Sequence, residues 1–592
     1  MKDLRIKISG TSGQGIISAG DILSYATARK GYYVTTYRAF PSEIRGDGKC
    51  YYTLRISEQK TLTATGESDI LICLDEDTIY EGIDTIKDGG ILIYDKDIVP
   101  ELKKTKENII TYGIPLKSLG NERARNMVAL GIVVGLLKNL HLEEQILKDI
   151  ELRYKAKEQK VIDSNKNALN SGFKYALEEL KREDNYECVK MESTGAKLIM
   201  SGNEAIGFAA LCAGCRLFAG YPITPATEIM EWLAKELPKL GGKMIQCEDE
   251  IAAINYALGG SFSGVKSMTA TSGPGLSLMQ EAIGLASMTE LPVVIADVQR
   301  SGPSTGMPTK TEQSDLFAAL YGTHGDCPKI VLAPMNVEDC FYQTINAFNF
   351  AEQYQVPVII LSDASLGPRR ECVDLIDLNK LKIVDRTKPK LKKGDVYNRY
   401  EDTKTGISPI TSVGDKYGEH TITGLEHTIS NAPTPAPEVH KQMTEKRFRK
   451  LETATTKFSK AKTYGSDDAS IGIISWGSTS GAVFEAIDEA DKKNIKVQAL
   501  YPRTLYPLPT TWIKDFIKNK EVIIVIEANY NAQFKSTIVE RCTHINRGVE
   551  VLEFLKYDGT PFLQKEILEE IEKVAKIQKE KNEISTNKHT HF

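Results

Sequence analysis

The sequence predicts a multidomain α/β protein, and three observations support this fold class. The chain has 592 residues, enough for about four domains of roughly 150 residues each. Runs of apolar and β-branched residues recur along most of it and alternate with amphipathic stretches typical of helices. Several of these runs are followed directly by a loop and a helix, which is the pattern of a parallel sheet covered by helices.

The first unit, residues 1–190, alternates strands and helices from its beginning. Its first expected strand leads into the loop Gly10–Gly15 and then into a helix from about Ile16 to Lys30. A Lys/Glu-rich helix later reaches a polar link around residues 185–193. This alternation predicts one sheet with helices on its faces. The expected strands cover residues 4–10, 32–37, 51–57, 69–75 and 89–95.

The second unit, residues 194–380, repeats the order of strand, loop and helix more regularly, which predicts a doubly wound sheet. Residues 381–465 are rich in Lys, Thr, Gly and Pro and have weak periodicity, so we interpret them as an extended linker. The α/β pattern returns over residues 466–575, and residues 576–592 form a polar tail that we expect to fray. The expected strands of these two α/β units cover residues 215–221, 243–248, 267–271, 292–299, 356–363, 470–477, 495–502 and 521–529, with a helix over 481–494.

Charge and hydropathy argue against two classes of partner. The chain has 75 Lys and Arg against 79 Asp and Glu, a net charge of −4, so no electrostatic excess is available to hold nucleic acid or an anionic membrane. The first ten residues lack the apolar core of a signal peptide. The longest strongly apolar run, Met127–Leu137, is far shorter than the roughly 18 residues of a membrane span. We therefore expect a cytoplasmic protein.

The cysteines predict neither a disulfide scaffold nor a metal site. Ten of them are scattered from Cys50 to Cys542, which fits a reducing compartment. A four-thiolate iron–sulfur or zinc site normally has two close pairs, or a run of three or four cysteines. Cys212 and Cys215 are the one close pair in the sequence, and their apolar surroundings favour packed thiols. We assign no metal to this chain.

The loop Gly10–Gly15 resembles the dinucleotide fingerprint, in which glycines let the backbone approach a pyrophosphate at a helix N-terminus. An NAD site also needs an acid at the end of the second strand to bind the ribose hydroxyl. The second expected strand, YYVTTYRAF, has no carboxylate, which argues against NAD. The loop then either binds another phosphate-bearing ligand or is a tight turn without a ligand.

The tripeptide Gly46–Gly48 resembles the start of a thiamine diphosphate motif, whose Asp holds the magnesium ion that clamps the diphosphate. The full motif needs an Asn further along the chain, and the matching stretch, DILICLDED, has none. An Asp-Gly pair between Ile44 and Tyr51 is also ordinary hairpin chemistry. We therefore expect no complete diphosphate site in this chain.

Three loops of the second unit are expected to meet at one edge of its sheet, because each follows a parallel strand and ligands bind outside the carboxyl ends of such strands. They are Tyr221–Pro225, Thr271–Gly275 and Gln299–Pro308. In the first loop, Thr224 is expected to be the helix N-cap and Pro225 the first helical residue. The loop is then either a capped helix start or an anion site.

Two charged residues are expected at the same edge. Arg300 follows the strand over 292–299 and would present a planar guanidinium to a carboxylate or phosphate, or else form an incidental ion pair. Glu250 begins a helix after the strand over 243–248, where an acid commonly complements the helix dipole. Glu248 and Asp249 compete with it for any special role.

Several motifs together resemble one enzyme family, and the resemblance covers nearly the whole chain. GYPITPATEI, QCEDEIAAINYALGGS, TATSGPGLSLM and QRSGPSTGMPTKTEQSDL are similar to the α subunit of the 2-oxoacid:ferredoxin oxidoreductases. GTSGQGIISAG and PSEIRGDGKCYYTLRIS resemble the γ subunit. RYEDTKTGISPI, TGLEHTISNAP and EKRFRKLE match the family's linker, and YPRTLYPLP and VIEANYNAQF its C-terminal domain. The chain thus resembles a fused γ–α large subunit, nearest to the 2-oxoglutarate type.

The resemblance implies a γ-type domain, a doubly wound domain that faces the pyrimidine ring of thiamine diphosphate, and a C-terminal domain like that of transketolase. It also implies a reaction in which a 2-oxoacid and CoA give acyl-CoA, carbon dioxide and reduced ferredoxin, or the reverse. In this family the cofactor lies between subunits, and Mg²⁺ and a [4Fe-4S] cluster belong to a β subunit. The chain is thus expected to be active only with a β subunit, in an (αβ)₂ assembly.

The resemblance also implies site residues by their positions in the motifs. Glu250, with Glu248 as the alternative, would hydrogen-bond the pyrimidine ring and activate the cofactor, while Thr224 and Arg300 would hold the substrate carboxylate. No metal ligand is implied. The implied cofactor contacts are Tyr221, Pro222, Ile223, Thr224, Glu250, Ser272 and Gly273, and the implied substrate contacts are Thr224, Arg300, Ser304 and Thr305.

Two other functions compete with this one. The chain could be a non-catalytic scaffold or binding subunit, with all activity in its partner. It could instead belong to a thiamine-dependent dehydrogenase that passes its acyl group to lipoamide, although those enzymes lack the γ-like domain that is tied to CoA use here. The preferred 2-oxoacid, 2-oxoglutarate ahead of pyruvate, rests on the resemblance alone.

Overall fold

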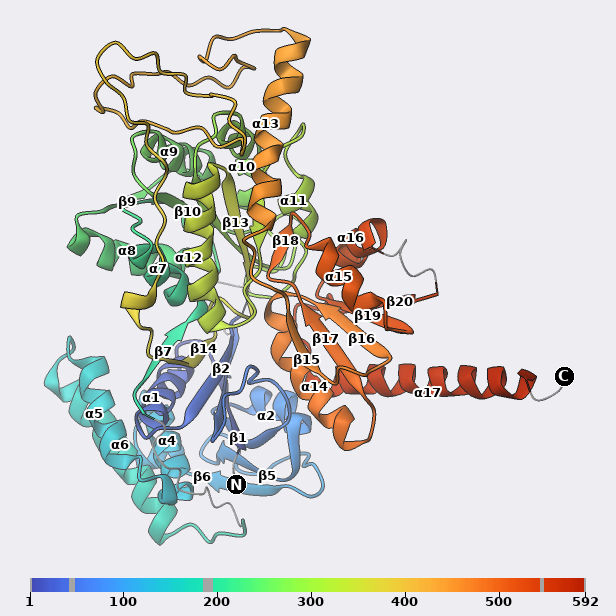
Figure 1. The fold of residues 1–592 in the computed structure, drawn as a ribbon. Coiled ribbons are helices and arrows are strands. Elements are labelled where there is room, and N and C mark those ends of the chain that lie inside the picture. The colour runs from blue at the N-terminus through green and yellow to red at the C-terminus, as the bar shows by residue number, and fades with distance from the viewer. Residues whose placement is uncertain (1–2, 42–47, 185–194, 543–547, 590–592) are drawn as a thin grey trace. The chain divides into compact units, whose positions relative to one another are not determined.

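The computed structural model forms two compact units (Figure 1), Met1–Ser201 with Arg369–Ile376 and Gly202–Pro368 with Asp377–Phe592. It describes residues 3–41, 48–184, 195–542 and 548–589. Three sheets, each with helices, are present in the described part of the chain. The α/β multidomain class predicted from the sequence is therefore confirmed.

The first unit contains an eight-stranded sheet of mixed direction. In spatial order its strands are β6 (Ile110–Ile114), β5 (Ile86–Asp95), β4 (Ser68–Cys73), β1 (Asp3–Thr11), β3 (Lys49–Ser57), β2 (Tyr33–Ala39), β14 (Arg370–Asp374) and β7 (Lys197–Ser201). β1 runs parallel to β4 but antiparallel to β3, and β2 pairs antiparallel with β3. A dinucleotide-binding fold requires the second strand to lie beside the first and parallel to it. Here the second strand, β2, is separated from β1 by β3.

Six α-helices pack on this sheet and on one another. They are α1 (Ile16–Arg29), α2 (Glu76–Gly82), α3 (Leu116–Leu119), α4 (Arg125–Leu136), α5 (Glu143–Tyr154) and α6 (Gln159–Glu178). Helix α4 is buried along its whole length and packs against α6. A Cβ atom at Gly131 of α4 would overlap the backbone of Leu169 in α6, so glycine permits this close approach.

Strands β7 and β14 depart from the domain boundaries expected from the sequence. Both lie within residues 194–380, yet they belong to the first sheet, where β14 pairs with β2 and β7 pairs with β14. The reason is that the chain crosses from the first unit along β7 and returns briefly as β14 before continuing. The polar link expected around residues 185–193 lies outside the described residues.

The second unit begins with a seven-stranded sheet. In spatial order its strands are β18 (Thr504–Tyr506), β12 (Ile330–Leu332), β13 (Pro357–Asp363), β11 (Val293–Gln299), β10 (Ser267–Thr271), β8 (Leu217–Gly220) and β9 (Lys243–Gln246). All neighbours are parallel except β12 and β18. This is the doubly wound arrangement predicted for the second unit, completed by one strand from the C-terminal region.

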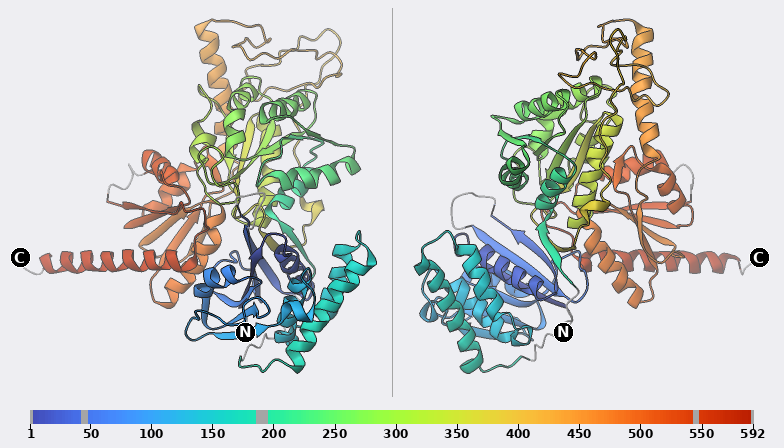
Figure 2. Two further views of the ribbon diagram at one scale, coloured as in Figure 1. Left: turned by 180° about the vertical axis from the view of Figure 1, so that it is seen from behind. Right: turned by 60° about the vertical axis from the view of Figure 1, so that its left-hand side comes forward.

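Helices cover both faces of this sheet, as Figures 1 and 2 show. They are α7 (Gly202–Cys212), α8 (Thr227–Glu236), α9 (Glu250–Phe262), α10 (Gly273–Met288), α11 (Leu316–Tyr321) and α12 (Val337–Tyr354). α9 and α10 pack together on one face, and α7 and α12 on the other. Strand β11 is buried along its whole length, as expected for a central strand between two helix layers.

A third sheet with its own helices follows in the same unit. In spatial order its strands are β15 (Lys462–Gly465), β17 (Val497–Tyr501), β16 (Ile471–Ser475), β19 (Val522–Glu527) and β20 (Glu550–Leu555), and its helices are α14 (Ser480–Lys492), α15 (Thr510–Ile517), α16 (Gln533–Cys542) and α17 (Gln564–His589). Helix α17 continues to His589, so the polar tail expected to fray from residue 576 is helical. None of the helices that the structure describes is long and apolar enough to span a membrane.

The linker over residues 381–465 is mostly irregular, but it contains the 19-residue helix α13 (Pro437–Thr455). The sequence analysis did not predict this helix. Its buried positions follow helical spacing, yet several carry Lys or Arg, so no apolar stripe marks it. They are Met443, Lys446, Arg447, Lys450, Leu451 and Ala454.

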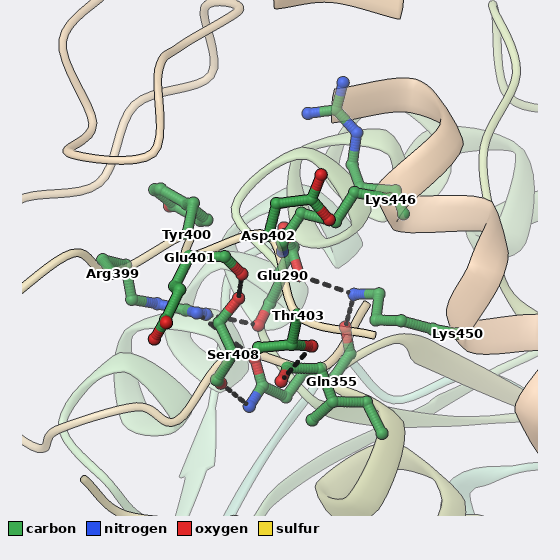
Figure 3. Close-up of polar contacts among 12 residues, drawn as sticks. Glu290, Gln355, Arg399, Tyr400, Glu401, Asp402, Thr403, Ser408, Lys446 and Lys450 are labelled. Atoms are coloured by element: carbon green, nitrogen blue, oxygen red, sulfur yellow. Dashed lines mark hydrogen bonds and ion pairs between the residues drawn. The ribbon is translucent and has the colours of Figure 1, made fainter. Parts of the chain in front are cut away.

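A buried charge cluster attaches α13 and the linker to the second sheet's helices (Figure 3). Glu290, after α10, accepts hydrogen bonds from Lys446 Nζ at 2.7 Å and Lys450 Nζ at 2.9 Å, and none of the three side chains is exposed. Arg399 donates to the backbone oxygen of Glu290 at 2.8 Å. Burial would raise the pKa of Glu290, but the three cations outweigh it and hold this pKa well below its usual range.

Candidate functional site

The site lies at the carboxyl edge of the second sheet. Strands β9, β8, β10 and β11 are adjacent and parallel, so the loops that follow them emerge on one edge. The expectation that the loops Tyr221–Pro225, Thr271–Gly275 and Gln299–Pro308 meet there is confirmed. Such an edge is where open α/β sheets bind ligands.

The loop after β8 differs from its predicted form. Helix α8 begins at Thr227 with Ala226 as its N-cap and no side-chain cap, so Thr224 is not the N-cap and Pro225 is not the first helical residue. Thr224 is exposed and contributes its backbone, whose carbonyl accepts a hydrogen bond from Arg300 Nη1 at 2.7 Å. Tyr221 is 40% exposed at the start of the same loop, followed by the half-buried Pro222 and Ile223.

Burial distinguishes the three acids at the start of α9. Asp249 is the N-cap and accepts from the backbone N–H of Ala252 at 2.7 Å, and both it and Glu248 are exposed. Glu250 is buried, with 6% of its surface exposed. A Cβ atom at Gly275 would lie 2.6 Å from Glu250 Cγ, so the glycine makes room for this side chain. Of the three acids, Glu250 is therefore the one that is buried, against the start of α10.

Arg300 is buried at the end of β11 and reaches across to the loop after β8. Its Nη1 is bonded to Thr224, whereas its Nε has no hydrogen-bond partner among the described residues. Burial lowers the pKa of Arg300, and the negative charges of Asp315 and Glu250 offset part of this shift by raising it. A guanidinium with an unused N–H in a partly dry site can bind a carboxylate with charge-assisted hydrogen bonds.

The remaining predicted contacts divide into two groups. Ser272 is fully buried before α10, and its Oγ has no hydrogen-bond partner among the described residues. Gly273 is the first residue of α10 and follows it directly. Ser304 and Thr305 are exposed in the loop after β11, and Ser304 has a positive φ of 57°. Ser272 and Gly273 therefore lie at the N-terminus of α10, whereas Ser304 and Thr305 lie on the exposed loop at the rim of the site.

Two carboxyl groups that the sequence analysis missed lie beside Arg300. Asp297 is fully buried in β11, three residues before Arg300, and Asp315 precedes α11. The two carboxyls influence each other electrostatically, and both oxygens of Asp297 lack a hydrogen-bond partner among the described residues. Burial raises the pKa of Asp315 to about 7, and burial together with Asp315 raises that of Asp297 well above its usual value.

A cavity of about 900 Å³ opens beside Arg300, large enough for a small-molecule ligand. The C-terminal region forms one of its walls, through residues after β19 and β20. The rings of Tyr530 and Tyr557 meet edge to face there, 5.1 Å apart. These aromatic and amide groups were not identified from the sequence, because only the folded chain brings them to the crevice. The lining includes Gly273, Arg300, Ser304, Glu312, Asp315, Asn529, Tyr530 and Tyr557.

In the first unit, the loop Gly10–Gly15 is explained by its backbone. Gly13 and Gly15 have φ of 91° and 77°, and a Cβ atom at Gly15 would overlap Asn126. A tight turn therefore accounts for both glycines without a ligand. Of the tripeptide Gly46–Gly48, only the last residue lies within the described residues.

The close cysteine pair takes the packed arrangement expected from the sequence. Cys215 is buried, and its Sγ contacts the backbone oxygen of Leu217 at 3.4 Å. Cys212 is half-buried at the end of α7.

Three family descriptions match successive parts of the chain. The pyruvate flavodoxin/ferredoxin oxidoreductase thiamine diphosphate-binding domain matches residues 208–446, which contain the crevice. The pyruvate ferredoxin/flavodoxin oxidoreductase domain matches residues 5–175, and core domain II of pyruvate:ferredoxin oxidoreductase matches residues 469–580.

Relatives match almost the full length of the chain. The 2-oxoacid:ferredoxin oxidoreductase subunit alpha of Saccharolobus solfataricus is 32% identical over 96% of this chain and 97% of its own. The 2-oxoglutarate synthase subunit KorA of Methanocaldococcus jannaschii is 43% identical over 55% of this chain and 87% of its own. The structure of 2-oxoglutarate:ferredoxin oxidoreductase from Magnetococcus marinus, with 2-oxoglutarate, coenzyme A and succinyl-CoA bound, matches 97% of this chain and 99% of its own with a TM-score of 0.91 and 37% identity. The chain therefore belongs to the α subunits of the 2-oxoacid:ferredoxin oxidoreductase family.

Proposed function

We propose that the chain is the large subunit of an enzyme that converts a 2-oxoacid, with 2-oxoglutarate preferred, and CoA to acyl-CoA and carbon dioxide while reducing ferredoxin. The observation that carries this proposal is the placement of Arg300 and Glu250. Both are buried at one crevice edge and interact electrostatically, and Arg300 lines a cavity large enough for a ligand. The Magnetococcus relative, which binds 2-oxoglutarate and CoA, supports the choice of substrates.

The residues at the crevice fit the pyrimidine side of thiamine diphosphate. Ser272 Oγ and Arg300 Nε are polar groups without a partner among the described residues, as expected where a polar ligand binds. Glu250 would hydrogen-bond the pyrimidine ring, with Tyr221–Thr224, Ser272 and Gly273 around it. When bound, the cofactor supplies the electron sink for decarboxylation.

The chain's own residues would bind and orient the substrate. Arg300 would grip the carboxylate next to the keto group, helped by the loop at Thr224 that already accepts one of its hydrogen bonds. Ser304 and Thr305 at the rim would contact the rest of the substrate. Glu250 would hold the cofactor in its reactive protonation state, a role suited to a carboxyl group that is buried and preorganised.

The partners follow from the incomplete diphosphate motif and from the family. We propose that Mg²⁺ and the [4Fe-4S] cluster belong to a β subunit, that ferredoxin accepts the electrons, and that the assembly is (αβ)₂. CoA would be bound with help from the γ-type first unit.

Coexpression with the β subunit tests the proposed function directly. The purified complex should reduce a viologen dye only when CoA and a 2-oxoacid are both present, and faster with 2-oxoglutarate than with pyruvate. The chain expressed alone should bind no iron and little thiamine diphosphate. Stoichiometric iron–sulfur absorbance in the lone chain would contradict the assignment of the [4Fe-4S] cluster to the β subunit. Reduction supported by lipoamide instead of CoA would favour the dehydrogenase alternative.

A further inference from the structure

The backbone that carries Asp315 is held in place, and Asp315 lines the same cavity as Arg300. Its backbone N–H donates to Gln299 Oε1 at 3.1 Å, and Gln299 in turn donates to the backbone oxygen of Ser362 at 3.0 Å. The preceding residue, Ser314, is held by Gln533 Nε2 at 2.8 Å from the C-terminal region. The peptide group between Ser314 and Asp315 is thus held through both its oxygen and its N–H, which fixes the backbone position from which the Asp315 side chain extends.

The site contains more acidic groups than cations. Arg300 interacts electrostatically with Asp315 and Glu250. Asp315 also interacts electrostatically with the carboxyl of Asp297 and with Glu312, and Glu312 in turn interacts with Asp558. Buried carboxylates that repel one another in this way cannot all be ionised together, so at least one of them keeps a proton.

Position decides which of the paired carboxyls ionises first. A Cβ atom at Gly273 would lie 2.7 Å from both oxygens of Asp315, so this carboxyl rests against the first residue of α10. The partial positive charge of a helix N-terminus stabilises an anion there. Asp297 lies deeper and is fully buried. The retained proton therefore resides on Asp297, and Asp315 is the carboxyl that carries the variable charge.

We propose that Asp315 is the counter-ion of Arg300 before substrate binds, and that it takes up one proton from solvent when the carboxylate of a 2-oxoacid binds to Arg300. A second anion on the same guanidinium would otherwise leave two negative charges facing one positive charge in a partly dry site. Asp315 thus acts through Arg300 as a positioning residue. This inference rests on the proposed function of the crevice.

The coupling predicts a specific pH dependence. Burial raises the pKa of Asp315 to about 7, and a bound carboxylate would raise it further. Binding then requires a proton only where the free site is ionised, so Kd is constant below pH 6 and increases about tenfold per pH unit above pH 7. The number of protons taken up is expected to be about 0.1 at pH 6 and about 0.9 at pH 8.

Titration calorimetry of the α–β complex with N-oxalylglycine measures this uptake. The probe carries the carboxylate of 2-oxoglutarate next to an amide carbonyl that does not react. The enthalpy is compared in phosphate and imidazole buffers, which cover pH 6 to 8 and whose different ionisation heats report the protons exchanged. Uptake near zero at pH 8, with a constant Kd between pH 6 and pH 8, would overturn the proposal.

Two variants should move in opposite directions, which a purely structural role would not produce. Asp315→Asn imitates the protonated state, so its Kd should be independent of pH and its uptake zero. In Asp297→Asn the amide donates to Asp315 and stabilises its charge, so binding should be weaker at pH 7 and uptake should persist at pH 6. If both variants only weaken binding equally at all pH values, Asp315 is structural.

The calorimetry also separates this inference from the proposed function. If the complex fails to bind N-oxalylglycine at any pH between 6 and 8, the crevice is not a 2-oxoacid site and the proposed function fails. Binding without proton uptake leaves the proposed function intact and rejects only the role of Asp315.

Discussion

Replacing Glu290 by Gln tests whether the buried charge cluster attaches α13 to the second unit. The change keeps the shape of the side chain and removes the negative charge between Lys446 and Lys450, which lie 2.7 and 2.9 Å from its oxygens. All three side chains are completely buried, so water cannot replace the lost charge. Removing one partner of a buried ion pair typically costs about 3–5 kcal/mol.

Hydrogen exchange of α13 is the appropriate measurement, because a chain of several domains does not unfold in one step. If the lost stability appears as local opening, amides of Met443–Ala454 should exchange roughly 10² to 4 × 10³ times faster, at about 1.4 kcal/mol per factor of ten. Lys450→Met should cost less, because Glu290 keeps Lys446 as a partner, although the backbone oxygen of Gln355 loses its hydrogen bond from Lys450.

The control is Glu445→Gln in the same helix. Glu445 pairs with Lys441 at 4.0 Å on the exposed surface, where such pairs contribute about 0–1 kcal/mol. The pH dependence gives a second check. The pKa of Glu290 in the folded protein is depressed from 4.5. The stability that its charge gives to α13 is therefore complete above pH 5 and declines as the pH falls below about 4.5. The difference in exchange rate between wild type and Glu290→Gln should decline over the same pH range. Equal exchange in Glu290→Gln and Glu445→Gln would refute the reasoning.

Three further predictions concern the activity of the α–β complex. Arg300→Lys keeps the charge but loses the planar fork, so KM should rise by roughly 10 to 150 for both pyruvate and 2-oxoglutarate; a penalty for 2-oxoglutarate alone would assign Arg300 to its distal carboxylate. Glu250→Gln should lower turnover by about 10² to 10⁴, with Glu248→Gln near normal, and the opposite result would exchange their roles. Gly275→Ala places its Cβ in overlap with Thr271 Oγ1 and 2.6 Å from Glu250 Cγ, so both side chains should move and turnover should fall by about 10². Gly284→Ala in the same helix meets no atom within 4 Å and should leave turnover unchanged.

Much of the site could be predicted because it depends on local pattern and one rule of topology. Strands over 267–271 and 292–299 were recognised from their apolar residues, and both were found as β10 and β11. Since parallel strands end on the same edge, their loops had to converge. The role of Thr224 as N-cap was wrong, because α8 begins three residues later and leaves only the Thr224 carbonyl to interact with Arg300.

The sequence alone determined the fold class, the crevice loops and the family, because periodicity, turn residues and motifs are properties of neighbouring residues. The tertiary structure decided which distant groups meet. The carboxyls of Asp315 and Asp297 interact only after β11 and the segment before α11 are packed together. The helix α13 could not be predicted from its own sequence, because lysines occupy its buried face. Burying these lysines is favourable only because Glu290, 156 positions away from Lys446 along the chain, supplies the opposite charge.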